Sequence, residues 1–575
     1  MKNNHCEFSK IRAIINQICL ENFKDIKPVV EKCDVLPPAP KFADKFEFAA
    51  NHAMILASFI KENPRDVAEK LINYIKNHEI HSKILHIEAV ASFINIKMKP
   101  EFWQEFLPKI IENSHYGFEN YGKGEKVNVE YVSANPTGPM HIGHARGAIY
   151  GDVISNLLEK CGYNVTREYY INDGGAQIKS VLDSVLFRAK QVIINDFSAN
   201  VPENCYPGEY IIPIARAVIE KFGQSITENA NSHEIIVDFV INYTLDIIKE
   251  DLQKLGVFHS IFTSEKKITR DGKVDLAVKL LEEKGLIYKG VLEKPKGNET
   301  QDWEAAEQML FASSKFGDDT DRAIRKNDGS WAYFTPDIAY HYDKYQRGFN
   351  KMILVLGADH KGYKKRISAA VNAISDGRAG VEVVLCELVN FLKNGTPMKM
   401  SKRAGNFLSL ADVLEEIDPQ ILRFFIITKK NDTVVDFDFA KVMEQSKDNP
   451  VFYIQYAYSR CCSLARKVEF NLENLANYDD LASLLSHPAQ IAIIHKLAQY
   501  PRTIQHCVAN LSPHLITSYL FELAGMFHAM WNISDFRFIS DDHTQTNANM
   551  ILVNAVKSTI KSALDCLGVS PMERM

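Results

Sequence analysis

The hydrophobic and polar positions in the first 112 residues form three helical patterns and one strand-like pattern. Apolar residues recur at helical spacing in three segments, 11–23, 67–75 and 102–111. Asn63-Pro64 is a favourable start for the second of these helices. The stretch 87–96 is apolar or alternating and predicts one strand. We therefore expect a separate N-terminal α/β domain over residues 1–115 and a glycine-containing linker over 113–126.

From residue 127 the pattern changes to strands that alternate with helices. Short apolar or β-branched stretches predict strands at 127–132, 163–171, 352–356 and 381–388. Proline- and glycine-rich stretches near 195–232 and 290–330 interrupt this rhythm, and we interpret them as insertions. The expected fold class is α/β, with a Rossmann-type doubly wound parallel sheet and insertions within a catalytic domain over 116–400.

The last part of the chain has a near-continuous helical pattern. We expect a connecting region over 395–443 and an all-α domain over 444–575. Four aromatic residues near the start of this domain could stack on RNA bases: Phe452, Tyr453, Tyr456 and Tyr458. Aromatic residues at helical spacing more often belong to a core, and we expect that role here.

Two histidines lie where the strand predicted at 127–132 turns into a helix. His141 and His144 are three residues apart, so their rings can face the same way, and Gly143 leaves room beside them. A helix N-terminus adds unpaired N–H groups and the positive end of a dipole, which suit phosphate. This arrangement fits a nucleoside triphosphate. The same spacing alone also fits a pair of metal ligands or two surface histidines.

A second segment favours the triphosphate. Lys399-Met-Ser-Lys-Arg403 lies far downstream between Gly395 and Gly405. A basic cluster alone is usually a solvated surface, but lysines on a glycine-flanked loop can move onto a polyphosphate. In this order the two segments resemble the HIGH and KMSKS signatures of class I aminoacyl-tRNA synthetases. The resemblance implies four catalytic residues, His141, His144, Lys399 and Lys402, and four contacts with ATP, Gly138, Gly143, Asp359 and Ser401.

Five further segments make the resemblance specific to arginyl-tRNA synthetases and extend it over essentially the whole chain. They are SANPTGP (133–139), YYIND (169–173), YFTPDIAYH (333–341), GADH (357–360) and GVSPMERM (568–575). The resemblance implies an N-terminal domain that touches the corner of the tRNA, a Rossmann catalytic domain and a helical anticodon-binding domain. Two positions depart from the family pattern: Lys361 stands where a second histidine is frequent, and Asp173 precedes two glycines where one is usual.

The substrate can also be considered from its chemistry. A guanidinium stays protonated and offers five donors in a planar fork, so its pocket needs carboxylates. Asp337 follows Pro336 in an apolar setting where an unpaired carboxylate would be costly. The resemblance implies that arginine is bound by Asn135, Glu265, Tyr333, Asp337 and His360, with Asn135 at its α-amino or carboxylate end. From its residue type alone, Glu265 could equally be a surface carboxylate.

The resemblance implies two steps at one site, formation of arginyl-adenylate and transfer of arginine to the terminal ribose of arginine tRNA. It also implies that activation requires bound tRNA. Magnesium should arrive with ATP, carried by phosphate oxygens and water, so we expect no metal held by the protein. Editing should be unnecessary, because a neutral side chain would leave the carboxylates unpaired. A point charge such as that of lysine cannot satisfy a fork-shaped site.

The composition of the chain mainly excludes certain classes of protein and of partner. A chain of 575 residues is too long for one core. It has no run of eighteen apolar residues and does not begin like a signal peptide, so we expect no membrane partner. The ten cysteines contain no C-x-x-C pair, which indicates a reducing compartment, the cytoplasm, and disfavours a zinc-dependent cysteine-specific synthetase. A net charge of −5 neither supports nor excludes tRNA. We expect a monomer.

Two rival functions remain open at this point. One is a small ligase that forms an acyl-adenylate, which would have no use for a domain-sized helical C-terminus. The other is a catalytically inactive RNA-binding relative, which the intact histidines and lysines disfavour.

Overall fold

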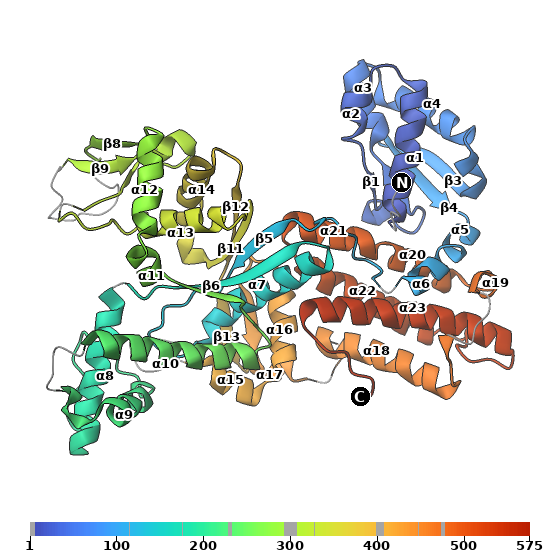
Figure 1. Ribbon diagram of the computed structural model, residues 1–575. Helices are drawn as coiled ribbons and strands as arrows, with labels where there is room; N and C mark the ends of the chain where they lie inside the picture. Colours follow the sequence, from blue (N-terminus) through green and yellow to red (C-terminus); the bar gives the residue numbers. More distant parts are fainter. Residues whose placement is uncertain are drawn as a thin grey trace. The chain divides into compact units, whose positions relative to one another are not determined.

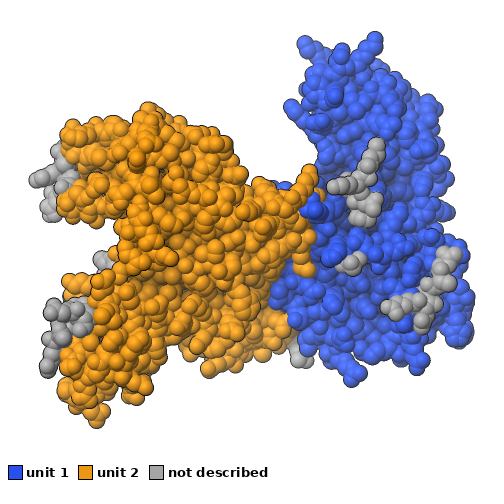
Figure 2. Space-filling view, in the orientation of Figure 1, with its two compact units in different colours: residues 1–120, 445–510, 514–575 blue, residues 121–444, 511–513 orange. Residues whose placement is uncertain are grey.

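The structure is a computed structural model that describes residues 6–113, 115–174, 176–227, 233–292, 307–326, 328–397, 408–444, 446, 448–472 and 478–575. The chain forms two compact units (Figures 1 and 2). One contains residues 1–120, 445–510 and 514–575, and the other contains 121–444 and 511–513. No helix in the described ranges is both long and apolar enough to cross a lipid bilayer.

The N-terminal part of the first unit is a four-stranded antiparallel sheet covered by helices. The strand order is β1 (Val35–Leu36), β2 (Phe48–Ala50), β4 (Phe93–Met98) and β3 (Ile84–Val90). The helices are α1 (Glu7–Asn22), α3 (His52–Ile60) and α4 (Pro64–Lys76). The Asn63 side chain accepts the backbone N–H of Arg65 at 2.9 Å and so caps α4. The helices expected at 11–23 and 67–75 are therefore confirmed.

Two other predictions for this region are wrong in detail. The single strand expected at 87–96 is a hairpin in which Ala91 and Ser92 join β3 to β4 with φ of 48° and 67°. Tight hairpin turns favour Asn or Gly at such angles, so this turn carries no sequence signal. The helix expected at 102–111 is two short helices, α5 (Pro100–Gln104) and α6 (Leu107–Glu112), and Pro108 lies in the first turn of the second.

The rest of the first unit is helical. Its helices are α18 (Pro450–Lys467), α19 (Tyr478–Ala482), α20 (Pro488–Ala498), α21 (Tyr500–Asn510), α22 (His514–Trp531) and α23 (His543–Leu567). Segments from the two ends of the chain meet in this unit: the Tyr116 hydroxyl donates to the Leu497 carbonyl at 2.7 Å, and the ring of buried Trp103 lies 4.9 Å from that of His495. Among the four aromatic residues expected in the core, Tyr458 is buried, whereas Tyr456 is 37% exposed.

The second unit is organised by a five-stranded parallel sheet in the order β12-β11-β5-β6-β7 (Figure 1). The strands are β5 (Lys126–Glu130), β6 (Asn164–Ile171), β7 (Ile261–Ser264), β11 (Lys351–Gly357) and β12 (Gly380–Cys386). The strand of this sheet that comes first in the chain, β5, lies at the centre between β6 and β11, so the strand order reverses there. Ligands of doubly wound sheets bind at the carboxyl ends of strands at such a point. The predicted fold class is confirmed.

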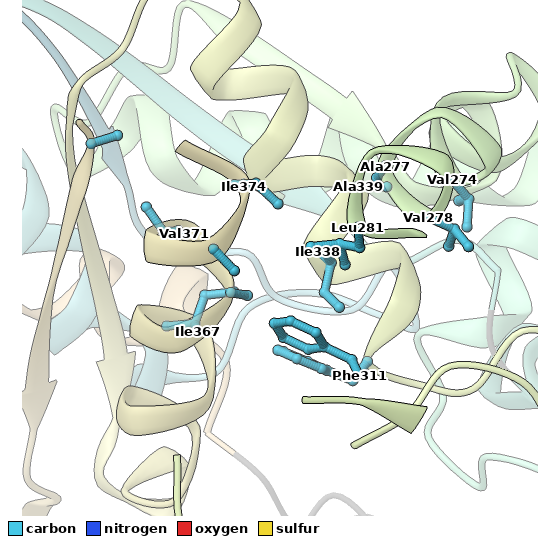
Figure 3. Close-up of a cluster of buried hydrophobic side chains, with 14 of the residues drawn as sticks. Val274, Ala277, Val278, Leu281, Phe311, Ile338, Ala339, Ile367, Val371 and Ile374 are labelled. Carbon is cyan, nitrogen blue, oxygen red and sulfur yellow. The ribbon is translucent and has the colours of Figure 1, made fainter. Parts of the chain in front are cut away.

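Three helices and a small sheet build the hydrophobic core above β11 and β12 (Figure 3). The helices are α12 (Lys273–Glu283), α13 (Thr335–Gln346) and α14 (Tyr363–Ser375), and the antiparallel sheet has the order β10 (Arg322–Ala323), β9 (Gln308–Phe311) and β8 (Ile287–Gly290). Leu281, Ile338 and Ile367 come from the three helices and surround Phe311 in this core. Each such fully buried side chain contributes roughly 1.5–3 kcal/mol, so the packing fixes α13 firmly.

Two further substructures complete the unit. Helices α8 (Ala176–Ile194), α9 (Ile211–Phe222) and α10 (His233–Lys254) enclose a core of their own. The strands β14 (Thr396–Pro397), β13 (Val389–Lys393) and β15 (Val435–Asp438) form a small mixed sheet, and helices α15 (Leu410–Glu416), α16 (Pro419–Ile427) and α17 (Phe439–Val442) lie in the same stretch of the chain.

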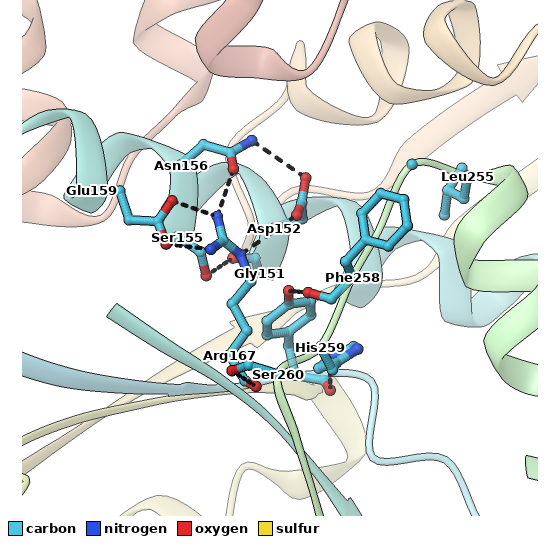
Figure 4. Close-up of polar contacts among 12 residues, drawn as sticks. Gly151, Asp152, Ser155, Asn156, Glu159, Arg167, Leu255, Phe258, His259 and Ser260 are labelled. Atoms are coloured by element: carbon cyan, nitrogen blue, oxygen red, sulfur yellow. Dashed lines mark hydrogen bonds and ion pairs between the residues drawn. The ribbon is translucent and has the colours of Figure 1, made fainter. Parts of the chain in front are cut away.

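Helix α7 (Ile142–Lys160), which follows β5, is held to the sheet by polar and close packing contacts (Figure 4). The Arg167 guanidinium on β6 donates to the Asn156 side chain at 2.7 Å and pairs with Glu159. Next to this network, Gly151 faces Tyr131 so closely that a Cβ atom there would lie 2.3 Å from the tyrosine ring. The glycine therefore allows the helix to approach the end of β5.

We expect Gly151→Ala to lower the free energy of unfolding by about 1–3 kcal/mol, because the new methyl group must displace Tyr131. Urea unfolding followed by circular dichroism measures this. The matched control is Gly147→Ala in the same helix, where a Cβ meets nothing within 4 Å and should stabilise the protein by roughly 0.5–1 kcal/mol. Equal effects of the two substitutions would contradict the close packing.

Candidate active site

The histidine pair lies where β5 ends and α7 begins. The backbone N–H of His141 donates to Nδ1 of His144 at 3.3 Å, and the two rings stack with centroids 3.7 Å apart. Because Nδ1 of His144 accepts, its neutral ring carries the proton on Nε2, which can donate to an anion. A side chain at Gly143 would lie 2.9 Å from the His141 ring. Both rings are partly exposed, so they are open to a ligand.

The chain just beyond the lysine segment is attached to the histidines. The Ile142 N–H donates to the Leu408 carbonyl at 3.3 Å, and the Leu410 N–H donates to the Met140 carbonyl at 2.8 Å. His141 and Ser409 form a bridge between these contacts. Lys399, Ser401 and Lys402 lie outside the described residues. The described chain that follows them is thus hydrogen-bonded to the start of α7.

Arg146, two residues after His144, connects α7 to the two chain segments that precede β13 and β15 of the small mixed sheet. It is 1% exposed, and its guanidinium donates to four backbone carbonyls, those of Glu387, Leu388, Lys430 and Thr433, at 2.7–3.2 Å. The first two carbonyls directly precede β13, the strand that leads towards the lysine segment. A lysine could not bind four carbonyls in this way, because it lacks the planar fork.

A group of acidic and phenolic side chains lies beyond the ends of β6 and β7. The Tyr170 hydroxyl donates to Oε2 of Glu265 at 3.0 Å. The Tyr363 hydroxyl at the start of α14 is hydrogen-bonded to the Asp337 carboxylate in the first turn of α13. Tyr333 is 77% exposed and lies within the electrostatic influence of both carboxylates. The structure therefore brings Tyr333, Glu265 and Asp337 together, although they come from distant segments.

Both carboxylates are held in an environment that disfavours their ionisation. Burial, followed by the negative charge of Glu265, raises the pKa of Asp337 to about 8, against the opposing effects of the Tyr363 hydrogen bond and the Arg366 charge. Burial also raises the pKa of Glu265, and the nearby charge of Asp173 adds to this. A cation that donates to both groups would favour their charged forms. The site is thus suited to a positively charged ligand with several donors.

Asn135 lies in the turn between β5 and the histidines. Its side-chain amide donates to Oε1 of Gln177 at 2.7 Å. The turn begins with Val132 and Ser133, whose φ angles of 68° and 41° are in the left-handed region. Such angles are strained for residues other than glycine, and most of all for a β-branched valine. Surrounding hydrogen bonds hold the turn, including one of 2.6 Å from the Tyr169 hydroxyl to the Ala134 carbonyl.

Asp359 and His360 follow β11 and lie at the same edge of the sheet. His360 Nε2 is 3.5 Å from Oδ2 of Asp359, and both side chains are exposed. The His360 ring also lies 6.3 Å from that of Tyr363, so the histidine is beside the tyrosine that holds Asp337. Gly138 packs against Tyr210, because a Cβ there would lie 2.6 Å from the ring. This contact explains the glycine without a nucleotide, and its role in ATP binding stays a prediction.

Tyr170 and Tyr363, which are hydrogen-bonded to the two carboxylates, are not among the site residues predicted from the sequence. Tyr170 belongs to the YYIND segment, so a family motif marked its position but not its function. Tyr363 has no comparable signal. Its partner Asp337 is on another helix, and the residues around Tyr363 have the character of a solvated basic helix face.

Family models match almost the whole chain. The model described as tRNA synthetases class I (R), catalytic domain, matches residues 106–196 and 244–448. The Arginyl tRNA synthetase N terminal domain matches 9–98, and the DALR anticodon binding domain matches 454–575. With the parallel sheet and the histidines at its carboxyl edge, these matches define a class I aminoacyl-tRNA synthetase.

Relatives identify the particular family. An arginine–tRNA ligase of Wolbachia pipientis wMel is 47% identical and covers 91% of this chain and 92% of its own length. One from Roseobacter denitrificans is 41% identical over 99% of both chains. The crystal structure of a putative arginyl-tRNA synthetase from Campylobacter jejuni has 30% identity and a TM-score of 0.71, and covers 83% of this chain and 100% of its own. The chain belongs to the arginyl-tRNA synthetase family, ligases that attach arginine to tRNA.

A more distant structure shows the same fold. The Thermus thermophilus arginyl-tRNA synthetase has 17% identity and a TM-score of 0.74, and covers 99% of this chain and 100% of its own.

Proposed function

We propose that this chain attaches L-arginine to its cognate tRNA in two steps at one site. The arginine carboxylate attacks the α-phosphate of ATP, which gives arginyl-adenylate and releases pyrophosphate. The terminal ribose hydroxyl of the tRNA then attacks the activated carbonyl and releases AMP. The observation that carries the proposal is the pairing of two partly buried carboxylates, Asp337 and Glu265, at the sheet edge that also bears the stacked histidines.

The acidic group fits a guanidinium better than other side chains. A guanidinium presents five coplanar donors, and both carboxylates together with the phenolic oxygens of Tyr170 and Tyr333 can accept them. A lysine ammonium would satisfy only part of this set, and a neutral urea would leave two negative charges unpaired. In this proposal Asn135 binds the amino or carboxylate end of arginine, and His360 lines the same pocket beside Tyr363.

The other predicted residues have roles at the phosphates. Nε2–H of His144, and His141 beside it, would donate to phosphate oxygens as negative charge develops, so catalysis is by positioning and electrostatics. Lys399 and Lys402 would hold the departing pyrophosphate, and Gly138, Gly143, Asp359 and Ser401 would contact ATP. Within the described ranges, no group of three or more His, Cys, Asp or Glu side chains could hold a metal ion. We propose that magnesium arrives with ATP, carried by the phosphate oxygens and water, where it neutralises charge.

We propose tRNA contacts for both ends of the chain: residues 1–115 at the corner of the tRNA, and 444–575 at the anticodon. In support of the second, Arg460 lies between two partly exposed aromatic residues, with its guanidinium 4.3 Å from the Tyr456 ring centroid and 4.6 Å from that of Trp531. Exposed aromatic and guanidinium planes are the usual partners of unstacked RNA bases. Residues 116–400 would form the catalytic domain and 395–443 its connection. We also propose that the chain acts as a monomer in the cytoplasm.

The test of the proposed function is tRNA charging by the purified chain. We expect ATP-dependent attachment of radiolabelled arginine to arginine-accepting tRNA and, with that tRNA present, pyrophosphate exchange with arginine but not with lysine or citrulline. Activation of an acid without any transfer to tRNA would favour a ligase that forms only acyl-adenylates. Binding of tRNA without either reaction would favour an inactive RNA-binding relative.

The pKa of Asp337 predicts a pH dependence of arginine binding. The guanidinium stays protonated throughout, but Asp337, with its pKa raised to about 8, is largely protonated at pH 6.5 and ionises as the pH rises. Because the cation pairs with the ionised form, the KM for arginine should fall by about 25-fold between pH 6.5 and 8.5. Steady-state charging across this range measures it. The same profile in Asp337→Asn should be flat, and a flat profile in the unsubstituted protein would contradict the assignment.

A further inference from the structure

A buried ion pair joins the helix that carries Asp337 to the strand that leads to Asn135. Lys344, near the end of α13, has no exposed surface, and its Nζ lies 2.6 Å from Oε2 of Glu130, the last residue of β5. Glu130 is 5% exposed. Because removing two charges from water costs free energy, buried pairs of this kind commonly contribute little net stability compared with apolar residues of the same size. A role beyond stability is therefore worth seeking.

The second oxygen of Glu130 holds the strained turn. Oε1 accepts the Ser133 hydroxyl at 3.1 Å, and the Ser133 oxygen accepts the Tyr170 N–H at 3.0 Å. Ser133 and its neighbour Val132 have the left-handed φ angles that are unfavourable for them, so the contacts around them must impose the turn. Asn135 follows two residues later. The Glu130 carboxylate thus helps to position the turn that carries Asn135.

One face of α13 connects this turn to the acidic group. Asp337, Tyr340 and Lys344 are spaced by three and four residues and therefore lie along the same side of the helix. The Tyr340 ring stacks on that of Tyr170, with centroids 4.3 Å apart, and Lys344 Nζ lies 4.1 Å from the Tyr340 centroid. Tyr170 in turn donates to Glu265. Helix α13 contacts the acidic group through Asp337 and the turn through Lys344. These two residues are seven positions apart, which is about 10 Å along an α-helix.

We propose that Lys344 is a positioning residue that sets the length of the arginine pocket. Through Glu130 it fixes the turn that carries Asn135 at a defined distance from Asp337 on the same rigid helix. An amino acid with one methylene more or fewer than arginine cannot reach both ends at this distance. The inference rests on the proposed function and adds to it the determinant of side-chain length.

The test compares arginine with L-homoarginine, one methylene longer, and with its homologue one methylene shorter. Lys344→Arg keeps the charge and lengthens the side chain, so it should push the Glu130 turn away from α13. We expect the ratio of kcat/KM for arginine to that for homoarginine to fall at least tenfold, while the KM for ATP stays within twofold. Charging of arginine-accepting tRNA by the full chain gives both values, and thermal unfolding monitors the fold.

A second variant removes the pair without leaving one charge buried. Glu130→Gln with Lys344→Met should fold and should raise the KM for arginine about tenfold, with weaker discrimination against both homologues. The matched control is Lys273→Met. Lys273 pairs with Asp343 on the same helix from α12 but has no connection to the turn, so the selectivity should stay within twofold.

The outcomes separate this inference from the proposed function. If the unsubstituted chain charges arginine and either folded Lys344 variant retains the original ratios, the positioning role is overturned and the proposed function stands. Loss of folding in both Lys344 variants would also overturn it, because the pair would then be needed only for the fold. If the unsubstituted chain does not charge arginine, the proposed function fails and this inference fails with it.

Discussion

Asp337→Asn is expected to lower kcat/KM for arginine at least about 30-fold. The substitution keeps the size of the side chain and its contact with Tyr363 but removes the charge that pairs with the guanidinium. Truncating one partner of a desolvated, hydrogen-bonded charge pair typically costs 2–5 kcal/mol, about 30-fold to several thousand-fold. Most of the loss should be in the KM for arginine, since the pairing is present in both the ground state and the transition state. Steady-state charging with arginine varied measures this.

The control for this variant is Asp376→Asn, an exposed aspartate at the end of α14 that pairs with Lys284 and Arg378. It should leave both constants unchanged within twofold. Asp337→Asn should also narrow the preference for arginine over neutral citrulline. If the variant charged arginine with an unchanged KM, Asp337 would not face the substrate, and the acidic group would need another ligand.

His144→Ala is expected to slow adenylate formation by 100- to 1,000-fold while arginine binds nearly as before. The ring donates from Nε2 because its Nδ1 is occupied by the His141 N–H. Removing one donor to charge that develops in the transition state typically costs about 2.7–4 kcal/mol in the barrier. Single-turnover formation of the adenylate at saturating ATP and arginine, with tRNA present, gives the rate directly. Equilibrium binding of arginine gives the affinity.

His144→Gln tests the donor role of His144 more directly than a substitution far from the site. Its amide nitrogen can occupy the place of Nε2 and donate, so it should recover at least tenfold of the rate lost in His144→Ala. His86→Ala, which removes a half-exposed histidine from β3, should have no effect on the rate. A collapse of arginine affinity in His144→Ala with an unchanged saturated rate would contradict the assignment to phosphate.

Local patterns predicted four strands of the catalytic sheet, at 127–132, 163–171, 352–356 and 381–388, but missed the edge strand β7 (Ile261–Ser264), which has only four residues. They failed at the hairpin of Ala91 and Ser92, where neighbouring strands impose left-handed angles on residues with no preference for them. They failed again at α5 and α6, where a continuous apolar pattern crosses two helices. At the hairpin, packing rather than local preference decides the backbone. At α6 there is a local signal, Pro108, which fits the first turn of a helix and not its interior.

For the site, motifs located the residues, but only the structure showed how they are held. Glu265 was compatible with a surface position until its hydrogen bond with Tyr170 placed it beside Asp337. Lys344 has no sequence signal at all, because a lysine in the middle of a helix is usually solvated. Its partner Glu130 is more than two hundred residues away in the chain and ends a different element. Pairings over such separations depend on the tertiary fold.

The central place of β5 has a consequence for biosynthesis. This strand is among the first parts of its unit to leave the ribosome, yet its neighbour β11 begins only at Lys351. Until β11 has been synthesised, one side of β5 presents unpaired backbone N–H and C=O groups, which can pair wrongly with other chains. A nascent or truncated polypeptide that stops before Lys351 would keep that open edge. It would also lack Asp359, His360 and Tyr363, which follow β11 beside the acidic group.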